Sequence, residues 1–486
     1  MKKLILVISS FISLFASAQN GITWNMGMNI AASSFGNMHP RMVTDGAGNP
    51  AVIFGRMSDQ SVFISRWNGT AFTMPMQVNP VSLTIATMSW QGPNIAAKGD
   101  TMYIVMKQTP EADTSSHIYI QRSFDGGISF SMPVQVDNIS DSISRFPTVT
   151  IDDNGNPIVA FMKMDAAFMD ARWVVAKSND FGNTFNVDTK ASGWSGGVIC
   201  DCCPGALANN GSNVLMVYRD NLNNLRDQWA GISTDNGNSF TAGMPIDQNN
   251  WMITSCPGSG PDAVIIGDTV HTVYMSSATG NAHVYYSAAS ISAMQGTTGS
   301  EITGNFAGLT IQNYPRIATD GTAMALAWKQ IVNGVDQCAL LFTNDIANGF
   351  PASYDTVDLS QVVNTDVAIA GGNIFVVWED GGSGTVKYRS GTFNSTTTVP
   401  KINSTVLFSI SPNPARGVIT IHSNDSGSNA EITVTDYLGQ KIFLNIIFSD
   451  QGYTRISTEN WNSGIYFITL FSENSISTQK IIIQHN

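Results

Sequence analysis

The sequence predicts an all-β protein: a β-propeller, with seven blades favoured and six as the alternative, followed by a small C-terminal β-sandwich. Three observations support this fold class. One sequence pattern recurs seven times at spacings of 50 to 57 residues. The 43 glycines and the charged fraction of only 12% suit short strands joined by tight turns. After a Ser/Thr-rich stretch near residue 400 the pattern stops, so a second domain follows the repeats.

Residues 1–18 predict a signal peptide. Lys2 and Lys3 precede an apolar run from Leu4 to Phe15, and the small residues up to Ala18 suit cleavage after that position. The run is shorter than the roughly 20 apolar residues of a membrane helix, and no later segment reaches that length, so we expect no transmembrane segment. The net charge of −12 argues against a nucleic-acid partner. We therefore expect an exported protein.

Residues 19–395 contain the seven repeats, which predict the blades of the propeller. Each repeat has an anchor residue, usually proline, then an apolar strand, a turn with Asp, Asn or Gly, and a second apolar strand. Two further strands follow, and four antiparallel strands form a propeller blade. The segment "ITWNMGMNI", before the first anchor, resembles a fourth strand, so we expect it to complete the last blade. The anchors are Pro40, Pro93, Pro147, Pro204, Pro261, Pro315 and Thr365.

A second motif recurs between the third and fourth strands of the repeats. It reads "SFDGGISF" from Ser123, "SNDFGNTF" from Ser178, "STDNGNSF" from Ser233 and, in degraded form, "TNDIANGF" from Thr343. The Asp side chain can accept backbone N–H bonds and the Gly can take a positive φ, which makes the motif a staple for a turn. The motif resembles the Asp-box of the sialidase-like propellers with BNR repeats.

This resemblance covers residues 20–395 and implies a propeller in which the Asp-boxes are structural and lie away from the active site. Sialidases have six blades, whereas seven repeats are present here. Some ulvan lyases are seven-bladed propellers that act on polysaccharides, so they are the competing family.

Residues 396–408 form a predicted linker, and residues 409–486 resemble the C-terminal sorting domain of the type IX (Por) secretion system of Bacteroidetes. The resemblance implies a small β-sandwich, the export machinery as a partner, and a secreted or cell-surface protein; an accessory binding sandwich is the alternative. The matching residues are Pro412–Asn413–Pro414, Asp436 with Gly439, Gly464–Ile465–Tyr466 and Lys480.

Cationic residues end most of the second strands, and rotation about the propeller axis predicts that they form a ring. A ring of cations suits a carboxylate or sulfate ligand; the alternative is that a basic residue simply ends each strand at the solvent edge. Arg41 and Arg316 directly follow anchors and predict a second, partial ring. The residues at the second-strand ends are Arg56, Lys107, Lys163, Arg219 and Lys329, with Ser276 and Glu379 in the other two repeats.

Three functions are compatible with this pattern. The first is a surface propeller that binds an anionic glycan or a surface partner without a demonstrated reaction. The second is a sialidase-type hydrolase, for which the resemblance offers Arg56 and Asp59 as the arginine and acid; Glu301 is the only glutamate between Glu111 and Glu379, which leaves the nucleophile pair without a good partner.

The third function is a uronate lyase, which needs a base, usually His or Tyr, beside a cation. The candidate bases are His39, His117, His271 and Tyr218. His39 adjoins the anchor Pro40 and is the best placed to face the channel, whereas His271 and Tyr218 lie within apolar strands. No cofactor is expected for any of the three functions.

Four cysteines gather near two anchors. Cys200, Cys202 and Cys203 lie in "VICDCCPGALA", and Cys256 lies in "SCPGSGP". Export permits disulfides, so we expect Cys256 to pair with one of the other three. An adjacent Cys202–Cys203 disulfide, free thiols and a metal site that adds Asp201 are the alternatives, and a metal is not favoured because the spacing matches no paired zinc motif. Cys338, in "DQCALLF", is expected to be a buried apolar residue.

Overall fold

The computed structural model describes residues 21–31, 36–393, 408–423, 431–436, 441–447, 453–472 and 475–485. The expected signal peptide and nearly all of the expected linker lie outside the described residues. The chain divides into two compact units, Met1–Thr396 and Thr397–Asn486. None of the described residues forms a helix that is long and apolar enough to cross a membrane.

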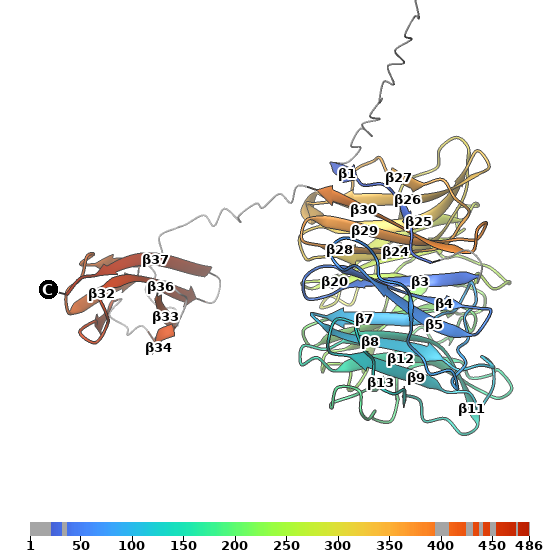
Figure 1. The fold of residues 1–486 in the computed structure, drawn as a ribbon, viewed down its shortest axis with the longest axis horizontal. Helices are drawn as coiled ribbons and strands as arrows, with labels where there is room; N and C mark the ends of the chain where they lie inside the picture. The colour runs from blue at the N-terminus through green and yellow to red at the C-terminus, as the bar shows by residue number, and fades with distance from the viewer. Residues whose placement is uncertain are drawn as a thin grey trace, which may run out of the picture. The chain divides into compact units, whose positions relative to one another are not determined.

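The first unit is a propeller whose described residues form seven antiparallel sheets, which confirms the favoured blade count (Figure 1). Blades 1 to 3 are β3 (Asn37–Thr44), β4 (Pro50–Arg56), β5 (Ser61–Arg66) and β6 (Met76–Gln77); β7 (Asn94–Lys98), β8 (Thr101–Lys107), β9 (Ile118–Ser123) and β10 (Val134–Gln135); and β11 (Ser142–Ile151), β12 (Pro157–Asp165), β13 (Arg172–Lys177) and β14 (Thr189–Lys190).

Blades 4 and 5 lie before and after Cys256 in the sequence. Blade 4 consists of β15 (Val198–Ile199), β16 (Ala206–Asn210), β17 (Asn213–Asn221), β18 (Gln228–Ser233) and β19 (Ala242–Pro245). Blade 5 consists of β20 (Asp262–Ile266), β21 (Thr269–Ser276), β22 (His283–Ser290) and β23 (Ser300–Glu301).

Blade 6 includes a short 3₁₀ helix, and blade 7 includes strands from both ends of the unit. Blade 6 consists of β24 (Leu309–Thr319), β25 (Met324–Val332), β26 (Val335–Thr343), η2 (Ile346–Asn348) and β27 (Asp355–Asp358). Blade 7 consists of β28 (Val362–Ala370), β29 (Asn373–Asp380), β30 (Thr385–Phe393), β1 (Ile22–Trp24) and β2 (Met28–Asn29).

The N-terminal segment closes the ring, as the sequence predicts. β1 pairs with β30, the third strand of blade 7, and Ile22 lies opposite Phe393 (Figure 1). The innermost strands also contact one another in a complete cycle, because β28 of the last blade contacts β3 of the first. The ring of blades therefore has no open side.

The propeller core lies between the blades. Among the described residues, one buried apolar cluster fills each of the seven interfaces between neighbouring blades. Large side chains anchor these clusters: Trp173 lies between blades 3 and 4, Trp328 between blades 5 and 6, and Trp378 between blades 6 and 7. Since each strand packs against a neighbouring blade on both faces, the second strands read as nearly continuous apolar runs.

The recurring turn motif has the geometry expected of a staple. In its second copy, Gly182 N donates to Ser178 Oγ at 2.8 Å, and the backbone N–H of Thr184 donates to Asp180 at 2.9 Å. The Thr184 hydroxyl donates to the same carboxylate, and Gly182 has φ +80°. The copies at Ser123 and Ser233 repeat these contacts. The motif therefore fixes the connection between the third and fourth strands.

The second unit is the small β-sandwich that the sequence predicts. One sheet contains β31 (Phe408–Ser411), β32 (Val418–Ser423) and β35 (Tyr453–Ser457), and the other contains β34 (Lys441–Ile447), β33 (Glu431–Asp436), β36 (Gly464–Ser472) and β37 (Ser475–Ile483). Buried side chains of both sheets, among them Ile419 and Ile468, form a single core.

Candidate functional site

The residues that flank the anchors line a cavity in the central channel of the propeller, which we call the channel cavity. In blades 1, 3 and 6 the innermost strand is bulged at the anchor. The residues before these anchors are His39, Phe146 and Tyr314, and their φ values are +52°, +51° and +51°. Bulky residues rarely adopt this conformation, and a bulge redirects a side chain out of the regular strand pattern. All three residues line the cavity.

The channel cavity is narrow. Its volume of about 60 Å³ can hold a few waters, since one water needs roughly 10–15 Å³ of such space. This volume also accommodates a carboxylate or sulfate group. The indole of Trp90 lines the same cavity and is 44% exposed, so an apolar surface lies where the cavity meets solvent.

The residues after the anchors form a ring of seven positions. From blade 1 to blade 7 these residues are Arg41, Asn94, Thr148, Gly205, Asp262, Arg316 and Asp366. Four consecutive blades, from blade 5 through blade 1, therefore carry alternating acidic and basic residues. Blades 2 to 4 present uncharged residues to the same channel.

The alternating charges balance one another. Arg316 Nη1 lies 3.5 Å from Asp262 Oδ1, and Arg316 Nε lies 3.5 Å from Asp366 Oδ1. Arg41 donates to the backbone oxygen of Pro40 at 2.7 Å. Burial, with the nearby charge of Arg316, lowers the pKa of Arg41 to about 9, so its guanidinium is still charged at neutral pH. Burial raises the pKa of Asp366 against the opposing effect of both arginines.

Besides His39, three side chains at the channel cavity carry an N–H donor that makes no hydrogen bond among the described residues. These donors are Arg41 Nε, Gln91 Nε2 and Arg316 Nε, of which Arg316 Nε has only the ion pair with Asp366 at 3.5 Å. Gln91 is only 2% exposed, and its oxygen already accepts from Phe146 N at 3.3 Å. A buried donor without an acceptor costs about 1–3 kcal/mol, so the site favours a group rich in acceptor oxygens.

His39 is held in a defined tautomer by Arg41. Its Nε2 lies 2.9 Å from Arg41 Nη2, and because a guanidinium only donates, this nitrogen accepts and the proton lies on Nδ1. Burial, followed by the charges of Arg41 and Arg316, lowers the pKa of His39 well below its ordinary value. The imidazole is thus neutral, but its lone pair is already used. The His39 backbone N–H donates to Glu379 Oε2 at 2.9 Å.

The structure divides the predicted cations into two groups. Arg41 and Arg316 line the channel cavity, whereas the five residues at the second-strand ends do not. Each of the five has its own partner within the blades. The contacts are Arg56 with Asp59 (Nε to Oδ1, 3.1 Å), Lys163 with Asp188 (3.0 Å), Lys329 with Asp336 (2.9 Å), Lys107 with Ser144 Oγ (3.1 Å), and Arg219 with the carbonyl oxygens of Arg226 (2.8 Å) and Met275 (2.7 Å).

The other candidate residues also lie away from the channel cavity. Asp59 pairs with Arg56, and Tyr218 is fully buried, with its hydroxyl oxygen accepting from Gly193 N at 3.2 Å. Burial raises the pKa of this tyrosine. The two remaining histidines and the one candidate glutamate contact other side chains: His117 lies 3.0 Å from Asp137, His271 lies 2.6 Å from the Tyr286 hydroxyl, and Glu301 lies 3.0 Å from His283.

Sequence reasoning did not single out five polar residues of the channel. Asp262 and Asp366 occupy the positions that Arg41 and Arg316 occupy in their own repeats, so extending the alignment to the residue after every anchor identifies them. Tyr314 and Asn364 precede anchors, as His39 does. Gln91 carries no such signal, because it lies in the loop that leads to the second anchor.

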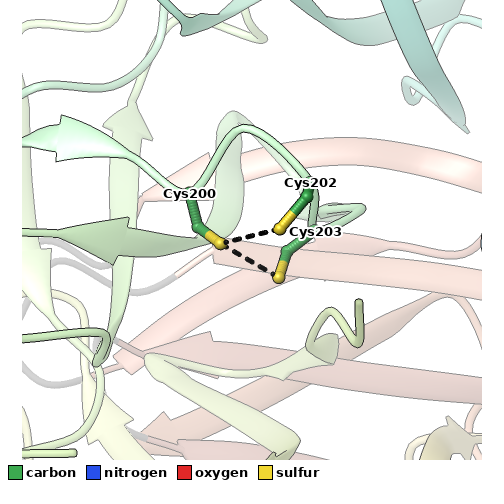
Figure 2. A group of neighbouring side chains, drawn as sticks. All are labelled: Cys200, Cys202 and Cys203. Carbon is green, nitrogen blue, oxygen red and sulfur yellow. Dashed lines mark hydrogen bonds between the residues drawn. The ribbon is translucent and has the colours of Figure 1, made fainter. Parts of the chain in front are cut away.

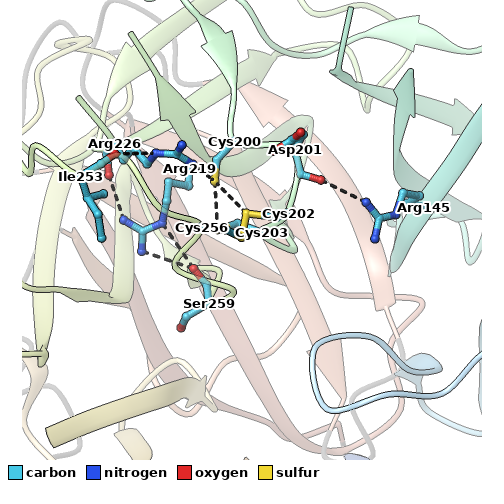
Figure 3. The surroundings of a disulfide bond; sticks show 10 residues. All are labelled: Arg145, Cys200, Asp201, Cys202, Cys203, Arg219, Arg226, Ile253, Cys256 and Ser259. Atoms are coloured by element: carbon cyan, nitrogen blue, oxygen red, sulfur yellow. Dashed lines mark hydrogen bonds between the residues drawn. A yellow bond between two sulfur atoms is a disulfide. The ribbon is translucent and has the colours of Figure 1, made fainter. Parts of the chain in front are cut away.

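The cysteines form the expected disulfide. Cys202 is bonded to Cys256, with 6.2 Å between their Cα atoms, which confirms one of the three expected pairings (Figure 3). The bond joins the turn before β16 to the loop before β20. Cys200 and Cys203 are buried free thiols on the same turn as Cys202 (Figure 2). Cys338 is buried in blade 6, as expected.

Comparison with solved structures finds propellers at low identity. A Hadza microbial sialidase is 11% identical, with 76% of this chain and 68% of that chain covered and a TM-score of 0.44. An α-L-arabinofuranosidase of Fusarium graminearum is 11% identical, with coverages of 66% and 98% and a TM-score of 0.47. An ulvan lyase is 11% identical, with coverages of 76% and 94% and a TM-score of 0.46.

The C-terminal domain has a family match. Residues 409–484 match the family described as the secretion system C-terminal sorting domain. This match confirms the predicted type IX route to the cell surface or the extracellular space. No curated protein matches the chain.

Proposed function

We propose that the propeller binds an anionic glycan and that the acidic group of the glycan enters the channel cavity. The observation that carries the proposal is a set of three buried donors, Arg41 Nε, Arg316 Nε and Gln91 Nε2, which belong to residues lining one cavity and make no hydrogen bond among the described residues. A carboxylate or sulfate offers several acceptor oxygens and a negative charge, which suits two guanidinium donors.

The size of the cavity and the position of Trp90 support a glycan as the carrier of this acidic group. The acidic group occupies the narrow cavity, and the sugar that carries it lies toward the solvent. The exposed indole of Trp90 offers an apolar platform beside the cavity, and an aromatic ring of this kind can cover the apolar face of a sugar. The export of the protein to the cell surface or beyond brings it to extracellular polysaccharides.

The test is a calorimetric titration of the full chain with an oligogalacturonate and with its methyl-esterified form, which has no free carboxylates. We expect binding of the acidic form alone, and a loss of about tenfold or more, equal to 1.4 kcal/mol, in Arg316→Gln. Arg56→Gln is the matched control, because Arg56 lies at a second-strand end and pairs with Asp59. Equal binding of the esterified ligand, or equal losses in both variants, contradicts the proposal.

A glycoside hydrolase is the second candidate. It is favoured by two buried carboxyl groups, Asp366, which lines the channel, and Glu379, which accepts from His39 N. Burial raises the pKa of both, and a general acid needs a raised pKa. Release of reducing sugar from an acidic polysaccharide, lost in Asp366→Asn, supports this reaction.

A uronate lyase is the third candidate, and the structure gives it less support. The lone pair of His39 already accepts from Arg41, so this imidazole cannot take a proton from a substrate without first losing that contact. An absorbance increase from an unsaturated uronate is the signal that distinguishes a lyase from a hydrolase.

A further inference from the structure

Four cysteines meet where the turn before β16 adjoins the loop before β20 (Figures 2 and 3). The Sγ atom of Cys200 lies 3.5 Å from that of Cys202 and 3.2 Å from that of Cys203. Cys202 is itself bonded to Cys256. A thiol of Cys200 is therefore in contact both with a disulfide and with a second thiol.

Two buried arginines surround Cys200. Arg226 Nη1 donates to Cys200 Sγ at 2.9 Å, and Arg226 Nε donates to the carbonyl oxygen of Ile253 (Figure 3). Arg219 is held by the carbonyl oxygens of Ser259 and Met275. The hydrogen bond with Cys203 and the charges of both arginines lower the pKa of Cys200, whereas burial raises that of Cys203. Cys200 is thus the thiolate of the pair, and a thiolate is the nucleophile in disulfide chemistry.

The same geometry argues against a metal ion at this cluster. The sulfur atoms of Cys200, Cys202 and Cys203 lie within 4.8 Å of one another. However, Cys202 is engaged in the disulfide, and a guanidinium already donates to Cys200. A cation at Cys200 would face the charge of Arg226 at close range, so the thiolate already has its counter-charge.

We propose that Cys200, Cys203 and the Cys202–Cys256 disulfide form an internal thiol–disulfide exchange site. The Cys200 thiolate attacks Sγ of Cys202, so that the Cys200–Cys202 bond forms, the Cys202–Cys256 bond breaks and Cys256 leaves as a thiolate. Cys203 then attacks Sγ of Cys200, which forms the Cys200–Cys203 bond and releases Cys202. The protons that Cys200 and Cys203 give to water are replaced by protons that Cys256 and Cys202 take up. One disulfide and two thiols are present before and after, so no oxidant or reductant is consumed.

The exchange turns a surface disulfide into a surface thiol. Cys256 is exposed, whereas Cys200 and Cys203 are buried. In the exchanged form the disulfide is buried and Cys256 is open to modification by thiol reagents. The loop after Cys256 also loses its covalent tether, and three residues of that loop, Gly258, Ser259 and Gly260, line the channel cavity. The state of the cysteines is therefore coupled to one wall of the cavity.

The experiment uses the full chain, purified without reductant and treated in its folded state with N-ethylmaleimide at pH 7. The protein is then unfolded, digested without reduction and analysed by mass spectrometry. We expect Cys256 to be alkylated with time while a Cys200–Cys203 link accumulates, because irreversible alkylation draws the exchange forward. Cys200→Ser abolishes the alkylation of Cys256, and Cys338→Ser, the matched control in another blade, leaves it unchanged.

Two further variants examine the separate steps. Cys203→Ser stops the exchange after the first attack, so we expect alkylated Cys256 together with a Cys200–Cys202 link. Arg226→Gln removes a charge that stabilises the thiolate, and the alkylation rate at pH 7 then falls about tenfold for each unit by which the pKa of Cys200 rises. Raising the pH to 9 restores the rate in this variant, whereas a merely disrupted fold shows no such recovery.

Two results overturn the proposal. One is a folded wild-type protein in which Cys256 stays unalkylated between pH 7 and pH 9 and Cys202–Cys256 is the sole link. The other is stoichiometric zinc or copper bound to protein in which all four cysteines are reduced. The wild-type measurement needs no substitution, so the test stands even if a variant does not fold.

Discussion

The guanidinium of Arg316 lies 3.5 Å from the carboxylate of Asp366, a residue of the next blade. Both residues follow the anchors of their repeats and face the same channel. This carboxylate competes with any anionic ligand for the charge of Arg316. The Asp366 carboxylate also accepts from the backbone N–H of Met42 at 2.7 Å. The side-chain oxygen of an asparagine at this position can accept the same hydrogen bond.

Asp366→Asn is therefore expected to strengthen the binding of an anionic glycan. The substitution removes a negative charge from the cavity and leaves Arg316 with Asp262 as its remaining acidic neighbour. We expect an affinity gain of about tenfold, equal to 1.4 kcal/mol, in a calorimetric titration with oligogalacturonate at low salt. Since screening weakens the competition between charges, the gain shrinks as salt is added. An unchanged or lower affinity contradicts this account.

Trp90→Ala tests the contribution of the sugar rings to binding separately from that of the acidic group. The indole offers an exposed apolar surface beside the cavity, and covering it with the apolar face of a sugar contributes roughly 25 cal/mol for each Å² removed from water. We expect the affinity for an oligogalacturonate to fall up to tenfold while the much weaker binding of acetate, measured by competition, does not change. Trp67→Ala is the control, because Trp67 packs on Phe72 at the turn after β5. A loss of both ligands shows that the cavity itself has been disturbed.

Asp220→Asn is expected to stabilise the propeller at pH 8 but not at pH 4. Burial raises the pKa of Asp220 to about 6, and its Oδ1 has no hydrogen-bond partner among the described residues. A raised carboxyl pKa favours the folded state below the unfolded value near 3.8, and this stability is lost as the pH rises through about 6.

The size of this effect follows from the rise in the pKa of Asp220. We expect the asparagine variant to gain about 1–2 kcal/mol in the free energy of unfolding at pH 8, measured by urea titration at both pH values. A gain of equal size at pH 4 shows that the effect does not come from the titration of Asp220.

Asp180→Ala is expected to destabilise the propeller through its turn. Asp180 accepts the backbone N–H and the hydroxyl of Thr184, and these bonds lower its pKa to about 2. Each lost hydrogen bond costs about 1 kcal/mol. Asp345→Ala, in the degraded copy, is the comparison; Asp345 accepts from Asn348 instead of from a Ser or Thr hydroxyl. Thermal unfolding should show the larger decrease in melting temperature for Asp180→Ala.

Most of the fold could be predicted because each repeat carries its own local signals. One blade can be predicted from the anchor, the pair of apolar strands and the turn residues of its repeat. The other blades follow because the same pattern recurs in their repeats. The first strand could be assigned to the last blade because "ITWNMGMNI" has the pattern of a fourth strand. These features depend on short-range sequence and on rotational symmetry, and both are visible without coordinates.

The candidate site could be predicted only in part. Arg41 and Arg316 follow anchors, and that position faces the channel. Lys163 and Lys329 lie in second strands, two and three residues before the ends of β12 and β25, and their side chains reach acids in their own blades. The left-handed conformations of Phe146 and Tyr314 have no signal in residue type. The pairing of Cys256 depends on the shape of the turn at Cys202, which spacing does not reveal.

The pairing of Ile22 with Phe393 also determines what the ring of blades needs in order to close. The strand that closes the ring, β1, lies at the start of the propeller sequence, whereas its partner β30 lies at the end of that sequence. Without this pairing, the last blade lacks the strand that the N-terminal segment supplies. Completion of the ring therefore depends on both ends of the propeller sequence, and a truncation at either end removes one partner of this pair.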